Sequence, residues 1–251
     1  MPSRYSEVQM VKIFLLIFVF CFSNLIAQQS KEWIEKLENP EFSSEQLKAE
    51  NVKEKYIKFD FSTLLIPRHD FLGYIGSNYK RIRIYFTSIS KDQEQNDIYN
   101  IIGISVVDDN KCDFSGKIKI DQIREYKHMD YGLDNHLINS GMKAQGVLIG
   151  TYLFDENPNQ SHSGVFEGIM TLFWYLDKFD IVHYDEIDIY SDDYKNNQYI
   201  GTWTEYKKQN GKICNWGEYR IPFSDDLDIG TGEFSPNPKY KEQGWADLIY
   251  Y

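Results

Sequence analysis

Residues Gly164 to Tyr190, GVFEGIMTLFWYLDKFDIVHYDEIDIY, decide the fold, because their apolar side chains recur at every second position. Asp177 and Lys178 stand where the chain can turn from a first alternating run into a second, Ile181 to Tyr190. One face of the first run carries five large apolar residues: Phe166, Met170, Leu172, Trp174 and Leu176. The stretch therefore predicts a β-hairpin with one face buried in a core.

Similar alternation extends over much of the remaining chain. Ile98 to Val107 is apolar on both faces, which favours a central strand. Asn210-Gly211 is a strong turn signal between the last two runs. The sequence thus predicts an all-β fold. The further expected strands are Tyr56–Leu65, Arg81–Phe86, Phe114–Ile120, Ala144–Phe154, Tyr199–Tyr206 and Lys212–Ile221.

Three of these strands share the pattern aromatic-x-Gly-x-apolar, at Phe114 to Ile118, Phe166 to Met170 and Tyr199 to Trp203. A glycine between two large residues allows a strand to coil sharply, or lets an aromatic side chain lie over bare backbone. Antiparallel strands bent in this way favour a barrel or a strongly twisted sandwich. Both architectures remain open from the sequence.

The first 27 residues have the pattern of a signal peptide. Arg4 and Lys12 precede an uninterrupted apolar run, Ile13 to Phe22, and the small residue Ala27 offers a cleavage site. That run is far shorter than the roughly 20 residues that cross a bilayer. We therefore expect an exported protein, periplasmic or secreted, that has no membrane span and begins at Gln28.

The mature chain is expected to be one domain. Residues 28–55 should form a helical segment, because Ser30 to Leu37 has apolar residues at helical spacing and Ser43 and Gln46 form a capping box. Residues 56–251 should form a single β domain with an irregular C-terminal tail.

The mature chain is distinctly acidic. Residues 1–27 contain two basic residues and one acidic residue, so 25 basic and 37 acidic residues remain, a net charge of −12. Such a field repels phosphate backbones and anionic lipid surfaces, and no cluster of lysine and arginine is large enough to reverse it locally. Nucleic acid is therefore not an expected partner.

Only Cys112 and Cys214 remain once the leader is removed. In an exported chain two cysteines most simply form one bridge, here closing a loop of about a hundred residues. We therefore predict a disulfide between Cys112 and Cys214. Two separate buried thiols are the alternative.

The stretch EIDIY, Glu186 to Tyr190, resembles the strand motif of the jelly-roll endo-β-glucanases related to laminarinase and lichenase. The resemblance implies that Glu186 is a nucleophile and Asp188 its helper in retaining hydrolysis. The third acid of that family is Tyr190 here, so the proton donor would have to come from elsewhere, such as Glu167 or Glu205. A solvated strand face is the alternative reading.

Gly201-Thr202-Trp203 resembles the Gly-x-Trp of lipocalins and the Gly-Thr-Trp of avidin-like barrels, which implies aromatic packing in a curved sheet. Trp203 lies between two threonines, and Trp216 stands beside Gly217 in a polar setting. Aromatic rings bind sugar faces and apolar ligands through a large flat surface. Trp203 and Trp216 are therefore the candidate ligand-binding residues.

The acidic residues near the C-terminus are a candidate calcium site. Carboxylate oxygens are the ligands that calcium requires, but the spacing here fits no EF-hand loop, and a solvated acidic turn is the alternative. No cofactor is indicated elsewhere in the chain. The four candidate metal ligands are Asp225, Asp226, Asp228 and Glu233.

Two further stretches, CNWGEYRIP at Cys214 to Pro222 and LDIGTGEF at Leu227 to Phe234, resemble an uncharacterised family of exported bacterial β-rich proteins. The resemblance implies no activity. We therefore expect a non-enzymatic exported protein that binds a small ligand, a glycan or a protein. A glycan-active hydrolase and a secreted inhibitor or surface-interaction protein are the alternatives.

Overall fold

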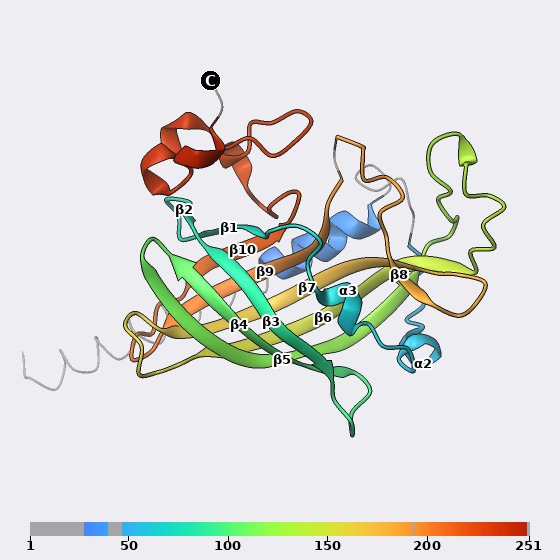
Figure 1. Ribbon diagram of the computed structural model, residues 1–251, viewed down its shortest axis with the longest axis horizontal. Helices are drawn as coiled ribbons and strands as arrows, with labels where there is room; N and C mark the ends of the chain where they lie inside the picture. Colours follow the sequence, from blue (N-terminus) through green and yellow to red (C-terminus); the bar gives the residue numbers. More distant parts are fainter. Residues whose placement is uncertain (1–27, 40–46, 193, 250–251) are drawn as a thin grey trace, which may run out of the picture.

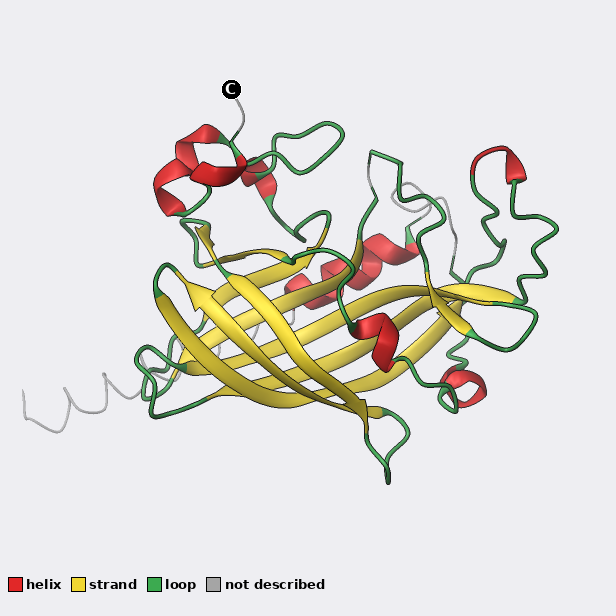
Figure 2. Ribbon diagram, in the orientation of Figure 1, coloured by secondary structure: helices red, strands yellow, loops and turns green. Residues whose placement is uncertain are grey.

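The structure is a computed structural model that describes residues 28–39, 47–192 and 194–249. The predicted signal peptide, residues 1–27, lies outside the described residues. Long antiparallel strands dominate the molecule, with short helices at the barrel ends and over the outer face (Figure 1; Figure 2). After a helix at 28–38, the elements are α2 (Lys53–Tyr56), α3 (Ser62–Leu65), β1 (Leu72–Ile75), β2 (Lys80–Arg81), β3 (Arg83–Lys91), β4 (Ile98–Val107), β5 (Asn110–Glu125), η1 (Leu133–Asn135), β6 (Ala144–Glu156), β7 (Gly164–Leu176), β8 (Val182–Tyr184), β9 (Asn196–Glu205), β10 (Lys212–Glu218), η2 (Asp225–Leu227), η3 (Pro238–Gln243) and η4 (Ala246–Leu248).

The strands form one sheet in the order β2-β1-β10-β9-β7-β6-β5-β4-β3, with β8 paired to β7. The two ends of this order are adjacent in sequence, since only Ile82 separates β2 from β3. The amide of Ile82 also donates to the carbonyl of Gly73 on β1, over 3.0 Å. The sheet therefore curls until its ends meet, which gives an antiparallel barrel-like fold, one of the two architectures that the glycine-bearing strands favour.

Strand β1, which takes part in closing the barrel, has only four residues. Helix α3 and the residues before it plug one end of the barrel. Helix α3 contacts β3 on one side and β7 on the other. Tyr56, Phe61, Leu64 and Leu65 belong to the same buried cluster as the inward-facing strand residues. The plug and the strands therefore share one continuous core.

Alternate strand residues fill the interior, as the period of two predicts. All five apolar residues of the β7 face, Phe166 to Leu176, are buried. At mid-barrel the rings of Trp216 and Tyr199 stack with centroids 4.9 Å apart. A Cβ on Gly201 would lie 2.1 Å from the carbonyl oxygen of Glu167 and 2.5 Å from the hydroxyl of Tyr152. Glycine there lets an aromatic side chain lie over bare backbone.

Two additional layers cover the outside of the barrel. The helix at 28–38 places Trp33 and Leu37 against Val147 and Ile149 of β6 and Ile200 of β9. The C-terminal η segments lie next to β2 (Figure 1). They bury Trp245 and Leu227 together with Tyr74 of β1. Among the described residues, no helix has the length and apolar character that a membrane crossing requires.

The predicted strand Tyr56–Leu65 is wrong, because this segment forms the end of α2 and all of α3. Asp60 accepts hydrogen bonds from the amide of Ser62, over 2.8 Å, and from its hydroxyl, which starts the helical turn. A helical turn presents Phe61, Leu64 and Leu65 to the barrel interior together, whereas a strand would turn alternate residues away. Burial of all three overrides the local alternation.

Two other predictions are also corrected. The second helix expected after Ser43 falls partly outside the described residues, and Leu47 pairs with Tyr126 in a β-bridge instead of lying in a helix. The second hairpin arm, predicted over Ile181–Tyr190, is limited to β8, Val182–Tyr184. After Tyr184 the chain leaves the sheet, because the preceding part of β7, up to Thr171, pairs with β9 instead of β8.

Candidate ligand pocket at the open end of the barrel

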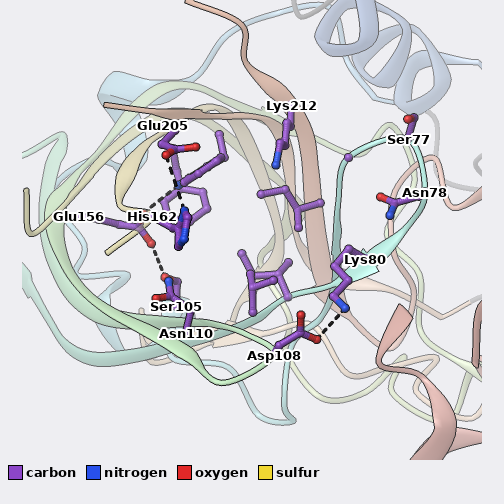
Figure 3. Close-up of a pocket in the computed structure, with 16 residues that line it drawn as sticks. Ser77, Asn78, Lys80, Ser105, Asp108, Asn110, Glu156, His162, Glu205 and Lys212 are labelled. Atoms are coloured by element: carbon purple, nitrogen blue, oxygen red, sulfur yellow. Dashed lines mark hydrogen bonds and ion pairs between the residues drawn. The ribbon is translucent and has the colours of Figure 1, made fainter. Parts of the chain in front are cut away.

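A pocket of about 460 Å³ opens at the end of the barrel where four hairpin connections meet (Figure 3). They join β1 to β2, β4 to β5, β6 to β7, and β9 to β10. Antiparallel strands joined by short turns bring these four connections to the same end. The lining residues are Ile75, Gly76, Ser77, Asn78, Lys80, Ile82, Ser105, Val107, Asp108, Asn110, Glu156, His162, Phe166, Trp203, Glu205 and Lys212.

Glu156, the last residue of β6, carries the buried carboxylate of the pocket. It is 3% exposed. Its Oε2 accepts hydrogen bonds from the amide of Gly164, over 2.7 Å, and from the indole Nε1 of Trp203, over 2.8 Å. Its Oε1 accepts from the hydroxyl of Ser105. One side chain thus gathers donors from β4, β7 and β9.

The protonation of Glu156 reflects two opposing effects. Burial penalises the charged form and raises the pKa of this carboxyl group, while the hydrogen bonds from Ser105, Trp203 and Gly164 stabilise the anion and partly offset the shift. The net direction is upward. The pocket therefore contains a proton-binding group shielded from bulk water.

Aromatic and charged groups complete the pocket. Trp203 is 7% exposed and lines it together with Phe166. The ammonium of Lys212 lies 5.4 Å from the centroid of the Trp203 ring, a cation–π distance. At the rim Lys80 pairs with Asp108 over 2.7 Å. An apolar, aromatic interior below a polar rim is the usual composition of a small-molecule site.

Glu205 lies at the mouth of the pocket on β9. Its carboxylate pairs with Lys208. Its Oε1 is also 3.7 Å from Nδ1 of His162, a contact marked by a dashed line in Figure 3. Hydrogen bonding from Lys208 lowers the pKa of Glu205. Unlike Glu156, this carboxylate already pairs with a lysine ammonium of the same chain.

The structure separates the two predicted tryptophans. Trp203 lines the pocket, whereas Trp216 is fully buried at mid-barrel, where it stacks on Tyr199. Trp216 faces the interior because it is in phase with Cys214, which is also buried on β10. The polar neighbours in sequence belong to the opposite strand face, so they did not indicate the environment of Trp216.

Glu186 and Asp188 do not form a catalytic strand face, because both lie in a turn after β8. The carboxylate of Glu186 pairs with Arg68 over 3.7 Å. This turn follows the β7–β8 hairpin, at the opposite end of β7 from the pocket. Glu186 and Asp188 therefore have the glucanase-like spacing in sequence but do not lie on one face of a strand.

The acidic residues near the C-terminus are divided among separate partners. Asp225 accepts from the hydroxyl of Tyr79 over 2.9 Å, Asp226 pairs with Lys239, and Asp228 pairs with Arg220 over 2.6 Å. Glu233 is exposed. In the part of the chain that the structure describes, no cluster of three or more His, Cys, Asp or Glu side chains is arranged to hold a metal ion.

Cys112 and Cys214 are free buried thiols in the structure, so the predicted bridge between them is absent from it. They lie on β5 and β10, which are not neighbours in the sheet. The thiol of Cys112 instead contacts the carbonyl of Ser161 at 3.5 Å and the side-chain amide of Asn110 at 3.4 Å. The position of both residues inside the barrel explains their burial without a bridge.

Sequence reasoning missed Glu156 and Ser105. Glu156 lies just beyond the predicted strand Ala144–Phe154, although it continues the inward-facing phase of Tyr152 and Phe154 on β6. Ser105 similarly continues the inward phase of Tyr99 and Ile101 on β4. A polar residue that continues the alternation of a buried strand face was the feature of the sequence that could have identified both residues.

No protein-family model, curated protein or solved structure matches this chain. Function is therefore inferred from the pocket itself.

Proposed function

We propose that this protein is an exported, non-enzymatic binding protein that takes a small ligand into the pocket at the open end of its barrel. The observation that carries this proposal is the buried pair Glu156 and Trp203, which lines a cavity of about 460 Å³. An aromatic wall and a desolvated polar group give shape and orientation to a ligand. The packed barrel provides the rigid support.

The test is a titration followed by tryptophan emission. All five tryptophans are described and buried, but only Trp203 lines the pocket. A panel of oligosaccharides, fatty acids and small amines should contain a ligand that changes the emission of the native protein. That response should disappear in Trp203→Phe and persist in Trp33→Phe, since Trp33 lies on the outer face of the barrel.

Two results would contradict the proposal. One is the absence of any response across the panel. The other is a ligand whose response is lost in Trp33→Phe but retained in Trp203→Phe. A glycan that is bound and cleaved, with cleavage lost in Glu186→Gln, would instead favour the hydrolase alternative.

Export is the second part of the proposal, supported by the leader pattern of residues 1–27. N-terminal sequencing of the protein recovered from the periplasm or medium should give Gln28 as the first residue. A retained leader would contradict release of the processed chain.

A surface-interaction protein is the second candidate, favoured by exposed apolar side chains at the other end of the barrel. Leu133 is 82% exposed, Phe179 71% and Tyr190 98%. Their loops lie together, since a Cβ on Gly132 would be 3.1 Å from Ile187 and a Cβ on Gly141 would be 2.9 Å from Lys178. A protein partner captured by cross-linking should be lost when Phe179 and Tyr190 are both changed to Ser, and kept in Trp203→Phe. Equal capture by both variants would contradict this function.

A further inference from the structure

We propose that the pocket ligand carries a cationic nitrogen, a protonated amine or a guanidinium, and that this group pairs with the carboxylate of Glu156. The inference rests on the proposed function and names the chemical class of its ligand.

The first observation is that no cationic side chain among the described residues pairs with the buried Glu156 carboxylate. Its three hydrogen-bond donors, Ser105, Gly164 and Trp203, are all neutral. The nearby ammonium groups are engaged elsewhere, because Lys80 pairs with Asp108 and Lys212 lies over the Trp203 ring. A buried charge is stabilised far more by a paired opposite charge than by neutral donors alone. A ligand cation would supply the missing partner.

The second observation is that Glu156 has an acceptor position left. A carboxylate has about four acceptor positions, and at Glu156 three are used, two on Oε2 and one on Oε1. Buried Glu218, at the other end of the barrel, shows the saturated case with two donors on each oxygen: the amides of Arg68 and His69, the hydroxyl of Tyr184 and the side-chain amide of Asn197. Glu218 is structural, whereas the free position on Glu156 is at a pocket.

The third observation is that the surroundings favour a cation. Phe166 and Trp203 line the same pocket, and ring faces attract cationic nitrogen. The position of the Lys212 ammonium over Trp203 shows that this ring already accepts a cation on one side. The net charge of −11 also draws cations towards the molecule.

The test uses three probes of similar size: 2-phenylethylamine, its N-acetyl derivative and 3-phenylpropionate. They carry a cation, a neutral amide and an anion on the same phenyl group. The amine should change Trp203 emission and bind roughly 10- to 100-fold more tightly than the other two, the range expected for a hydrogen bond to a charged group.

Glu156→Gln is the decisive variant, because the amide oxygen can still accept from Gly164 and Trp203 while the amide nitrogen can donate to Ser105. Its fold should be preserved, as checked by circular dichroism and thermal unfolding. Amine affinity should fall roughly 10- to 100-fold. The matched control Glu54→Gln removes the same charge from an exposed residue of α2 that does not line the pocket, so it should leave amine affinity unchanged.

Equal affinity for the amine and its N-acetyl derivative, or an unchanged amine affinity in Glu156→Gln, would overturn the inference. So would a stronger response to 3-phenylpropionate. In each case a Trp203-dependent response to some ligand would leave the proposed function standing. If no ligand of any class changes Trp203 emission, the proposed function fails as well.

Discussion

The indole N–H of Trp203 donates to Oε2 of Glu156 over 2.8 Å and so joins β9 to β6, two strands separated in the sheet by β7. Ser105 reaches the same carboxylate from β4, which lies two strands from β6 on the other side. The hydrogen bond between Trp203 and Glu156 therefore links, through the barrel interior, two strands that are not paired through their backbones. Glu156 holds together the end of the barrel that forms the pocket.

The first prediction concerns Glu156 and pH. Because burial raises the pKa of this carboxyl group, its contribution to stability is present below the ordinary carboxyl pKa and is lost as the pH rises through the raised value. Glu156→Gln removes the buried charge and keeps the hydrogen bonds. The thermal midpoint of this variant relative to the native protein should therefore increase from about pH 4 to about pH 8.

Glu156→Ala is the control for that experiment. It leaves three donors unpaired and creates a void, so the free energy of unfolding should fall by roughly 2–4 kcal/mol. A flat difference between Glu156→Gln and the native protein across the pH range would contradict the predicted proton linkage.

The second prediction concerns Glu125, which ties α2 to β5. Burial alone would raise its pKa, but hydrogen bonds from Lys48, Lys55 and Tyr56 outweigh burial and lower it from 4.5 to about 2. Stability from this group is therefore present above about pH 4.5 and is lost as the pH falls towards 2. Glu125→Gln should lower the unfolding free energy at pH 7 by roughly 1–3 kcal/mol, with the difference shrinking in acid.

Urea unfolding at several pH values measures this effect. Glu54→Gln is the matched control, since Glu54 lies on the same short helix and is exposed. Its unfolding free energy should follow that of the native protein. A constant difference between Glu125→Gln and the native protein from pH 7 to pH 2 would show that the ion pairs do not set this pKa.

The third prediction concerns the thiols. When the protein is denatured without reductant, Cys112 and Cys214 should both be counted as free thiols. In the native state both should react slowly with a disulfide reagent, because burial shields them and raises the pKa of each thiol. Reductant should leave the thermal midpoint unchanged. A thiol count of zero would restore the bridge predicted from the sequence.

The fourth prediction concerns Gly201, which faces Gly168 directly across β7 and β9. A Cβ at Gly201 would lie 2.1 Å from the backbone oxygen of Glu167, so the strands must move apart. Gly201→Ala should lower the unfolding free energy by roughly 2–4 kcal/mol, the range of an overpacked core.

Gly232→Ala is the matched control, because the nearest atom to its added Cβ would be Asp192 Oδ1 at 3.5 Å. Its unfolding free energy should change by less than roughly 1 kcal/mol. Equal effects of the two substitutions would mean that crowding between β7 and β9 is not the cause of the stability lost in Gly201→Ala.

The sequence by itself determined which residues face the core along the long strands. Ile98–Val107 was predicted as a strand and is β4 with the same bounds, and the inward face of β7 was named residue by residue. Alternation is decisive there because a strand that slips by one residue turns its whole apolar face to solvent. The glycine pattern, which reflects steric crowding between strands, likewise indicated a curved sheet.

Only the tertiary structure decided the plug and the pocket. Alternation over Tyr56–Leu65 predicted a strand, but the open barrel end takes Phe61, Leu64 and Leu65 together as a helical turn. Ser105, Glu156 and Trp203 are separated by 51 and 47 residues in the chain, yet share one carboxylate. Alternation determines the face of each side chain, whereas its height along the barrel depends on strand register and on closure of β2 and β3 against β1, which are properties of the whole sheet.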